Sequence, residues 1–513
     1  MLIDIRAWVQ NIIILIIGFF IFYNTGLHGD DYTAINYFNN KNFAEIFLIN
    51  PMHLGVWTYV LPAYLIFYSF YQIFGSDYIV GYELLKFIIH VSSIFFVYKF
   101  FSNFVSKSRS FIASLFFVFF ISHDSTTYWY MASAYMLFFP SLVFFSFHLI
   151  YNNYLLRGTI LLILCSFCYS TPPVIFGLSF YFLLKKQFIK FSIFLSSGIL
   201  FLIYYFLISY FYPITENRID DSLNIIILFR NFIFQFLSSI DATIGLNIIF
   251  KIYYSLTYID LVSFLITIYL TFIIFVNLKS ENKNLFNFPL LFSLFTIYIF
   301  SLSMFALTGM YTQSSFNLGN RVTIYFCILI GYLIIMLKNK YFLVAITSII
   351  LFLPVTSNSN YWKEWNQTQL TIYKNINNNL ELNNIKEDIL IIEKNNYSKL
   401  GPFSHIELFA MNWHVENRFR DICIKENIMA LTSYTKIQNN KLVDFKSNKI
   451  IYLSERIYLY DTDLNLLKKV NKSDLSNIQN EIHEIRHWTQ LLDKNGNIVK
   501  LILLLNPRLE YLF

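Results

Sequence analysis

The chain has 513 residues, of which 56% are hydrophobic, 20% aromatic and only 13% charged, whereas about 25% of the residues of an ordinary soluble protein are charged. This composition excludes a simple soluble enzyme, and the 58 Phe and 38 Tyr residues exclude a disordered chain, because so much apolar surface has to be buried in protein or lipid. We therefore expect a polytopic α-helical membrane protein. Its net charge of +7 indicates basic cytoplasmic loops, and we expect no nucleic-acid partner.

The first apolar run, from Trp8 to Tyr23, is long enough to span a bilayer. No small-residue cleavage pattern follows it, so it is predicted to be a retained signal anchor. Ten further apolar runs are found at 80–101, 108–122, 133–151, 158–171, 174–184, 189–211, 258–278, 287–309, 320–337 and 341–355. Together these runs predict about eleven membrane-spanning helices at roughly 20 residues each, several of them short.

The orientation follows from the positive charges, because Lys and Arg concentrate in short cytoplasmic loops. The basic clusters are Lys99, Lys107 and Arg109; Arg157; Lys185, Lys186 and Lys190; Lys279 and Lys283; and Lys338 and Lys340. All of them fall on the side of the N-terminus only if the ambiguous apolar run 56–74 does not cross. We therefore predict a cytoplasmic N-terminus and place 56–74 within a long external loop, 24–79, where it dips into or lies on the membrane. A second long external loop covers 212–257, and long external loops suggest chemistry on the outer face.

At about residue 356 the composition shifts to Asn, Lys, Glu and Asp. We expect a transmembrane domain at 1–355 and an extracytoplasmic α/β or α+β domain at 356–513, which is large enough for a core of its own. Its predicted elements are a helix at 361–380, strands at Asp388 to Glu393 and Lys449 to Leu453, and a hairpin turn at Asp493 to Gly496 between two alternating runs.

The most informative stretch is His28-Gly29-Asp30-Asp31-Tyr32, directly after the first apolar run. Two adjacent carboxylates at a membrane boundary repel one another and tend to acquire a cation, a proton or a hydroxyl partner. Such a pair suits a general base, or a ligand of a divalent cation such as Mg²⁺ or Mn²⁺. The alternative is that the two Asp residues cap the helix that follows.

The order of features along the chain resembles a known family. An acidic pair after the first span is followed by an apolar aromatic segment that ends in Phe74-Gly75, by a span with His90, by a basic turn and by the external segment His123 to Trp129. This succession resembles the polyprenyl-phosphate-sugar-dependent glycosyltransferases of the GT-C superfamily, in particular the protein O-mannosyltransferase-like branch and its bacterial relatives. The polar C-terminal domain is similar to that of several bacterial members.

The resemblance implies an inverting transfer of a sugar from a polyprenyl-phosphate donor to a hydroxyl group of a glycan, lipid-linked saccharide or protein acceptor. Asp30 and Asp31 match the acidic motif of the first external loop, which deprotonates the acceptor or holds a metal that does so. Departure of a lipid phosphate needs positive charge nearby, and Arg321, at the outer start of a late span, is the best candidate because its guanidinium matches phosphate. The alternative for Arg321 is an interfacial side chain that reaches to lipid headgroups.

Further residues of the external loops are candidates for substrate binding. They are His28, Tyr32, His53 and Trp57 in the first loop, His123, Asp124 and Tyr128 in the second, and Arg218 in the loop 212–257. For the aromatic residues, an interfacial belt explains the pattern as well. For Arg218, the alternative is a solvated, salt-bridged helix, and the apolar stretch from Leu223 to Leu237 is predicted to be an amphipathic helix on the membrane surface.

Two further motifs are not assigned a function. Cys165 and Cys168 form a CxxC pair, but it lies in an apolar run where small residues pack helices. His483 to His487 matches HExxH, which binds zinc only on a helix, whereas the alternating context predicts a strand with the two His about 13 Å apart.

The sequence therefore predicts a multi-pass glycosyltransferase of a bacterial inner membrane, which acts in the cell envelope with its C-terminal domain periplasmic or extracellular. An O-antigen-type polymerase is the alternative enzyme. A transporter or flippase of lipid-linked saccharides, which would use the cavity without chemistry, and a non-catalytic scaffold are the alternatives from other classes.

Overall fold

The computed structural model describes residues 5–39, 41–49, 58–76, 78–211, 224–278, 285–308, 313–316, 318–385, 389–392, 415, 419, 427–431, 435–444, 449–454, 456–462, 464–475 and 496–505. The chain forms two compact units. The first comprises Met1–Gly26 and Phe38–Lys363, and the second comprises Leu27–Tyr37 and Glu364–Phe513. The residues around the expected boundary at 355 belong to one continuous helix, so the change in composition does not coincide with a break in the backbone.

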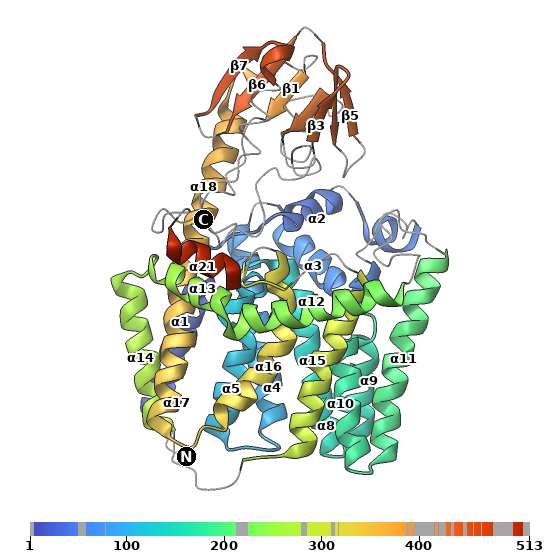
Figure 1. Ribbon diagram of the computed structural model, residues 1–513, viewed down its shortest axis with the longest axis vertical. Helices are drawn as coiled ribbons and strands as arrows, with labels where there is room; N and C mark the ends of the chain where they lie inside the picture. The colour runs from blue at the N-terminus through green and yellow to red at the C-terminus, as the bar shows by residue number, and fades with distance from the viewer. Residues whose placement is uncertain are drawn as a thin grey trace. The chain divides into compact units, whose positions relative to one another are not determined.

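The first unit is a bundle of helices (Figure 1). Its α-helices are α1 (Ile5–Phe22), α3 (Leu61–Phe74), α4 (Ile79–Phe101), α5 (Lys107–Phe119), α6 (Asp124–Tyr128), α7 (Tyr130–Ala132), α8 (Phe139–Tyr151), α9 (Leu155–Cys165), α10 (Pro172–Leu184), α11 (Phe188–Phe211), α12 (Ile225–Ile244), α13 (Leu246–Leu256), α14 (Leu261–Asn277), α15 (Phe288–Thr308), α16 (Ile324–Ile335), α17 (Lys340–Ile346) and the first part of α18 (Leu353–Asn378). It also contains two 3₁₀-helical segments, η3 (Ile121–His123) and η5 (Leu318–Thr323), and three π-helical segments, η1 (Glu45–Ile49), η4 (Ser133–Phe138) and η6 (Thr347–Phe352), among the described residues.

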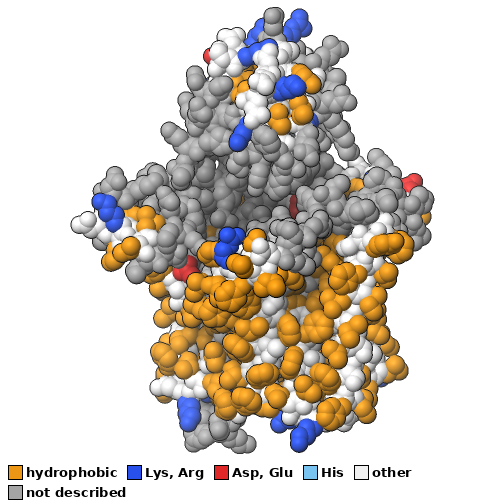
Figure 2. Space-filling view, turned by 45° about the vertical axis from the view of Figure 1, so that its right-hand side comes forward, with side chains coloured by type: hydrophobic (Ala, Val, Ile, Leu, Met, Phe, Trp, Pro, Cys, Tyr) orange, Lys and Arg blue, Asp and Glu red, His pale blue; other side chains and the backbone are white. Residues whose placement is uncertain are grey.

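The helices confirm that the protein carries apolar segments suited to a membrane. All eleven predicted runs contain helix, and within the described residues six segments are long and apolar enough to cross a bilayer. These are Ile79–Phe101, Tyr130–Tyr151, Phe188–Phe211, Ile225–Leu256, Phe288–Thr308 and Lys340–Asn378, and six shorter apolar helices accompany them. Large apolar side chains cover the outside of the bundle (Figure 2), among them Phe206, which is 66% exposed. Such a surface requires lipid around it.

Small residues allow the helices of the bundle to pack closely. A Cβ atom added at Gly177 in α10 would lie 2.7 Å from the backbone N of Ile297 in α15. Ser293 of α15 donates a hydrogen bond of 2.7 Å to the carbonyl of Gly177. Close backbone approach with a hydroxyl bond across the contact is typical of helices that associate in lipid.

Helix α12 runs across the bundle instead of along it (Figure 1). The side chains that it buries are small or polar, namely Gln235, Ser238, Ser239, Ala242 and Thr243. Most of its exposed side chains are large and apolar, such as Ile226 at 79% and Phe229 at 66% exposure. The structure confirms a helix in the predicted stretch from Leu223 to Leu237, and the exposed apolar face fits an interfacial helix.

The loops of the bundle gather at two ends. At the first, which we call the basic end, Asn103 after α4 accepts a hydrogen bond of 3.1 Å from His148 of α8, and Arg109 of α5 donates to the carbonyl of Leu337 after α16 at 2.8 Å. At the other, which we call the Asp124 end, the amide of Tyr169 donates to the carbonyl of Tyr59 at 2.8 Å.

The second unit contains two sheets, formed by β1 (Ile389–Ile392), β2 (Ile428–Ala430), β3 (Thr435–Gln438), β4 (Lys441–Asp444), β5 (Lys449–Tyr452), β6 (Ile457–Asp461) and β7 (Leu466–Val470). The first sheet has the order β2-β1-β6-β7, in which β1 is parallel to both neighbours and β7 is antiparallel to β6, and β3-β4-β5 form an antiparallel meander. Ile391, Met429, Leu442 and Ile451 bring both sheets into one apolar core. The strands predicted at 388–393 and 449–453 are confirmed.

One predicted element of this unit is wrong. The run after Gly496 forms the helix α21 (Asn497–Leu505), not the second strand of a hairpin. Its apolar residues also repeat at helical spacing. In the helix, Val499 is buried, whereas Lys500 and Leu504 are exposed. A short apolar run cannot be assigned to strand or helix by periodicity alone. The HExxH residues His483 to His487 lie outside the described residues.

Candidate functional site

Asp124, predicted from the second external loop, is the centre of a buried polar cluster at the Asp124 end. Its carboxylate accepts four hydrogen bonds, and the side chain is only 3% exposed. The donors are Lys251 Nζ at 2.9 Å and Asn320 Nδ2 at 2.5 Å on Oδ1, and Asn358 Nδ2 at 2.6 Å and Trp362 Nε1 at 3.1 Å on Oδ2. These donors come from α13, η5 and α18, so one carboxylate joins segments that are far apart in the chain.

The pairing with Lys251 explains how Asp124 can remain charged in a buried position. Lys251 is completely buried, and removing an ion from water costs several kcal/mol unless a partner and further hydrogen bonds compensate. The two amides and the indole satisfy the carboxylate oxygens that the ammonium group leaves available. The arrangement gives Asp124 a positioning role.

The neighbours of Asp124 in the chain are also buried. His123 is fully enclosed, its Nδ1 lies 2.6 Å from Thr126 Oγ1, and burial lowers the pKa of its imidazole to about 4. Tyr128 donates its hydroxyl to the carbonyl of Val355 at 3.0 Å, and its ring stacks on Trp362 with 5.5 Å between the centroids. Both side chains therefore pack inside the protein, and His123 is neutral at pH 7.

Arg321 follows the cluster residue Asn320 directly in η5. Its Nη1 donates to the hydroxyl of Tyr135 at 2.9 Å, and its guanidinium lies 5.5 Å from the ring centroid of Trp129. The residue is only 8% exposed. Arg321 is therefore held within protein by two aromatic side chains, and this placement does not support an Arg that reaches to lipid headgroups.

The bundle also fixes the point where the chain leaves towards the acidic pair. Glu83 Oε1 accepts the amide of Gly26 at 3.0 Å, and Lys86 Nζ donates to the carbonyl of Gly26 at 2.6 Å. Lys86 further donates to the carbonyl of Tyr128 at 3.1 Å. Gly26, which has φ of 69°, is thereby joined to the segment that carries Asp124, and Asp30 follows it by four residues.

The acidic pair itself belongs to the second unit, at the start of α2 (Asp30–Phe38). Asp31 is completely buried, and its Oδ2 accepts the backbone amide of His28 at 3.1 Å. Asp30 is half-buried. The two carboxylates thus differ: Asp31 stabilises the helix start, as expected of a capping residue, whereas Asp30 reaches the surface of its unit.

Helix α18 supports the segment that carries the pair. Gln369 donates to the carbonyl of Leu27 at 2.8 Å and to Asn366 Oδ1 at 2.9 Å. The ring of Tyr32 meets the ring of Tyr373 edge-on at 5.8 Å. His28 is buried and Tyr32 is half-buried.

A divalent cation at this pair would meet Asp30, which is half-buried, whereas Asp31 is completely buried. Among the described residues, no group of three or more His, Cys, Asp and Glu side chains is arranged to hold a metal ion. Mg²⁺ keeps several waters and binds through one or two carboxylates together with substrate phosphate. If an ion binds at the pair, Asp30 would hold it, because Asp31 is buried and stabilises the start of α2.

Sequence reasoning found some of these residues and missed others. His53, Trp57 and Arg218 lie outside the described residues. The missed members of the cluster are Lys251, Asn358 and Trp362, and Tyr135 beside Arg321. Two sequence features indicate a buried polar face: a single Lys in the apolar run of α13, and an Asn and a Trp four residues apart on α18.

Comparisons with protein-family models, curated proteins and solved structures find no match to this chain.

Proposed function

We propose that this protein is an inverting membrane glycosyltransferase that moves a sugar from a polyprenyl-phosphate donor to a hydroxyl acceptor on the outer face of a bacterial inner membrane. In this proposal eleven helices span the membrane and α12 lies on its outer face. The acceptor is a glycan, a lipid-linked saccharide or a protein. The observation that carries the proposal is the Asp124 end of the bundle. There, Arg321 directly follows Asn320, a partner of Asp124, in η5. Lys86 joins Gly26, from which the chain continues to Asp30, to the carbonyl of Tyr128.

In this mechanism Asp30 takes the proton from the acceptor hydroxyl as its oxygen bonds to the anomeric carbon. The bond from that carbon to the phosphate oxygen breaks on the opposite face, which inverts the configuration. The phosphate leaves with a developing negative charge that the guanidinium of Arg321 stabilises. Asp31 holds the start of α2, and Asp124 holds Asn320, and through it η5 and Arg321. If a divalent cation takes part, it supplies positive charge at the acidic pair.

The experiment is sugar transfer from a panel of radiolabelled polyprenyl-phosphate sugars to membrane extracts, with the purified full-length protein in liposomes. Asp30→Asn is expected to lower kcat by about 10²–10⁴-fold, the range of general-base catalysis, at an unchanged unfolding temperature. Asp31→Asn is expected to lower the unfolding temperature in addition to kcat. Asp260→Asn, which replaces an exposed carboxylate that caps α14, is the matched control and should transfer at the wild-type rate.

Two results would contradict the proposal. Equal transfer by the wild type and Asp30→Asn would remove Asp30 from the mechanism. Absence of transfer from every donor, together with movement of a lipid-linked saccharide between leaflets, would establish a flippase.

A further inference from the structure

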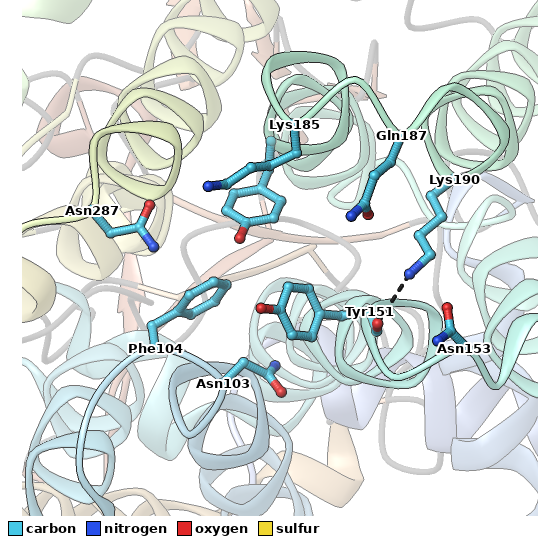
Figure 3. Close-up of a pocket in the computed structure, with 9 residues that line it drawn as sticks. Asn103, Phe104, Tyr151, Asn153, Lys185, Gln187, Lys190 and Asn287 are labelled. Carbon is cyan, nitrogen blue, oxygen red and sulfur yellow. Dashed lines mark hydrogen bonds between the residues drawn. The ribbon is translucent and has the colours of Figure 1, made fainter.

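A cavity opens at the basic end of the bundle, and none of the residues that line it takes part in the proposed reaction (Figure 3). Its volume is about 580 Å³, within the range of roughly 300–1,000 Å³ that is usual for small-molecule sites. The walls come from the ends of α4, α8 and α10 and from the starts of α11 and α15. It is formed entirely within the first unit.

The lining of this cavity is positively charged. Lys185 and Lys190 contribute two ammonium groups, and among the described residues the other polar side chains that line the cavity are amides and phenols, with no Asp or Glu. Within the part of the chain that the structure describes, neither lysine has a carboxylate at salt-bridge distance. Lys190 Nζ donates one hydrogen bond of 3.0 Å, to the carbonyl of Tyr151, and an ammonium group has three protons to donate. Figure 3 shows Lys185 extending towards Asn287 across the cavity.

Short, defined turns hold these groups in place. Lys186 adopts φ of 56°, and the amide of Gln187 donates back to the carbonyl of Phe182 at 2.8 Å, which ends α10 tightly. The carbonyl of Gln187 then accepts the amide of Phe191 at 3.0 Å as α11 begins. On the other wall, Asn287 Oδ1 accepts the amide of Leu290 at 3.2 Å. Lys185 and Lys190 are therefore placed by helix ends, not by a long loop.

The residues beside the cavity face lipid. Leu184, Phe188 and Ile189 are 41%, 62% and 74% exposed, although all three are large and apolar. Figure 2 shows basic side chains at the edge of the broad hydrophobic surface of the bundle. A ligand in the cavity can therefore place a negative group between the lysines and an apolar tail along this surface. Basic pockets between membrane helices bind anionic headgroups in this way.

We propose that this cavity binds a phosphate group, held between Lys185 and Lys190, and that the headgroup of an anionic phospholipid supplies it. The amides of Asn287 and Gln187 donate to the remaining phosphate oxygens. The site is separate from the proposed sugar transfer, and the protein holds the lipid as a bound component of the leaflet at the basic end.

The test is native mass spectrometry of the delipidated full-length protein titrated with phosphatidylglycerol, phosphatidylcholine or inorganic phosphate. The variants are Lys185→Gln, and Lys185→Gln with Lys190→Gln. The matched control is Lys338→Gln with Lys340→Gln, which removes the same charge at the same end outside the cavity. Phosphatidylglycerol is expected to bind more tightly than phosphatidylcholine. Its affinity should fall roughly fivefold with Lys185→Gln and about thirtyfold with the double variant, but not with the control.

Each outcome bears on the proposal. Binding of inorganic phosphate that depends on the two lysines, without tighter binding of phosphatidylglycerol than of phosphatidylcholine, would retain the phosphate site but overturn the phospholipid as its source. Equal losses in the cavity and control variants would show a general charge effect and overturn the proposal. Equal binding of both lipids with no binding of phosphate would overturn it too. Lys185 makes no described side-chain hydrogen bond, so its single variant remains informative if the double variant fails to fold.

Discussion

At the scale of single residues, Asp124 shows how a predicted binding residue can act through position. Its four donors leave the carboxylate saturated, so it has little capacity to bind a substrate hydroxyl. Its neighbour Asn320 precedes Arg321, which links the ion pair with Lys251 to the residue proposed to meet phosphate.

Replacement of Asp124 by Asn leaves the Lys251 ammonium group buried without its counter-charge. We expect a loss of about 3–5 kcal/mol in the free energy of unfolding, measured by thermal unfolding in detergent. Asp124→Asn with Lys251→Met removes both charges and should recover most of this loss. If the double variant is no more stable than Asp124→Asn, the ion pair is not the cause.

At the scale of elements, α12 buries polar and exposes apolar side chains, which is the reverse of an amphipathic helix in a soluble protein. Its polar face packs on the bundle and its apolar face is exposed, which places the helix against lipid. Length and hydropathy alone also allow Ile225–Leu256 to cross a membrane. The crosswise direction of α12 distinguishes the two possibilities.

A spin label at Phe229→Cys should therefore report a shallow position, at headgroup depth, whereas a label at Ile268→Cys in α14 should report the bilayer interior. The measurement is depth by electron paramagnetic resonance in liposomes, in a Cys423→Ser background, because Cys165, Cys168 and Cys327 are buried. Equal depth at the two positions would refute the interfacial helix.

The elements also show what the sequence can predict. Apolar runs predicted helices of the bundle from the sequence alone, because lipid imposes long apolar helices. The short run after Gly496 was misassigned, because strand and helix spacing cannot be distinguished over nine residues. The partners of Asp124 could not be predicted, because Lys251, Asn320 and Trp362 meet it only through the packing of helices more than a hundred residues apart.

At the scale of the whole molecule, the positive charges predict that the basic end of the bundle lies in the cytoplasm. Lys338 lies at the basic end, and Thr257, exposed after α13, lies at the other. A membrane-impermeant maleimide added to intact cells should label Thr257→Cys and spare Lys338→Cys, again in a Cys423→Ser background. Permeabilised cells should show labelling at both. The reverse pattern in intact cells would invert the orientation, and would place the proposed reaction in the cytoplasm.

The Asp124 cluster can form only late during synthesis of the chain. Trp362 is 238 residues from Asp124, which corresponds to roughly 10–50 s of translation at about 5–20 residues per second. Throughout that interval the carboxylate has been synthesised while its last partners have not. Its place at the end of the bundle lets water solvate it until α18 arrives. The polar network therefore closes only when the transmembrane part is complete, and a nascent chain that stalls before Asn358 exposes an incomplete site to quality control.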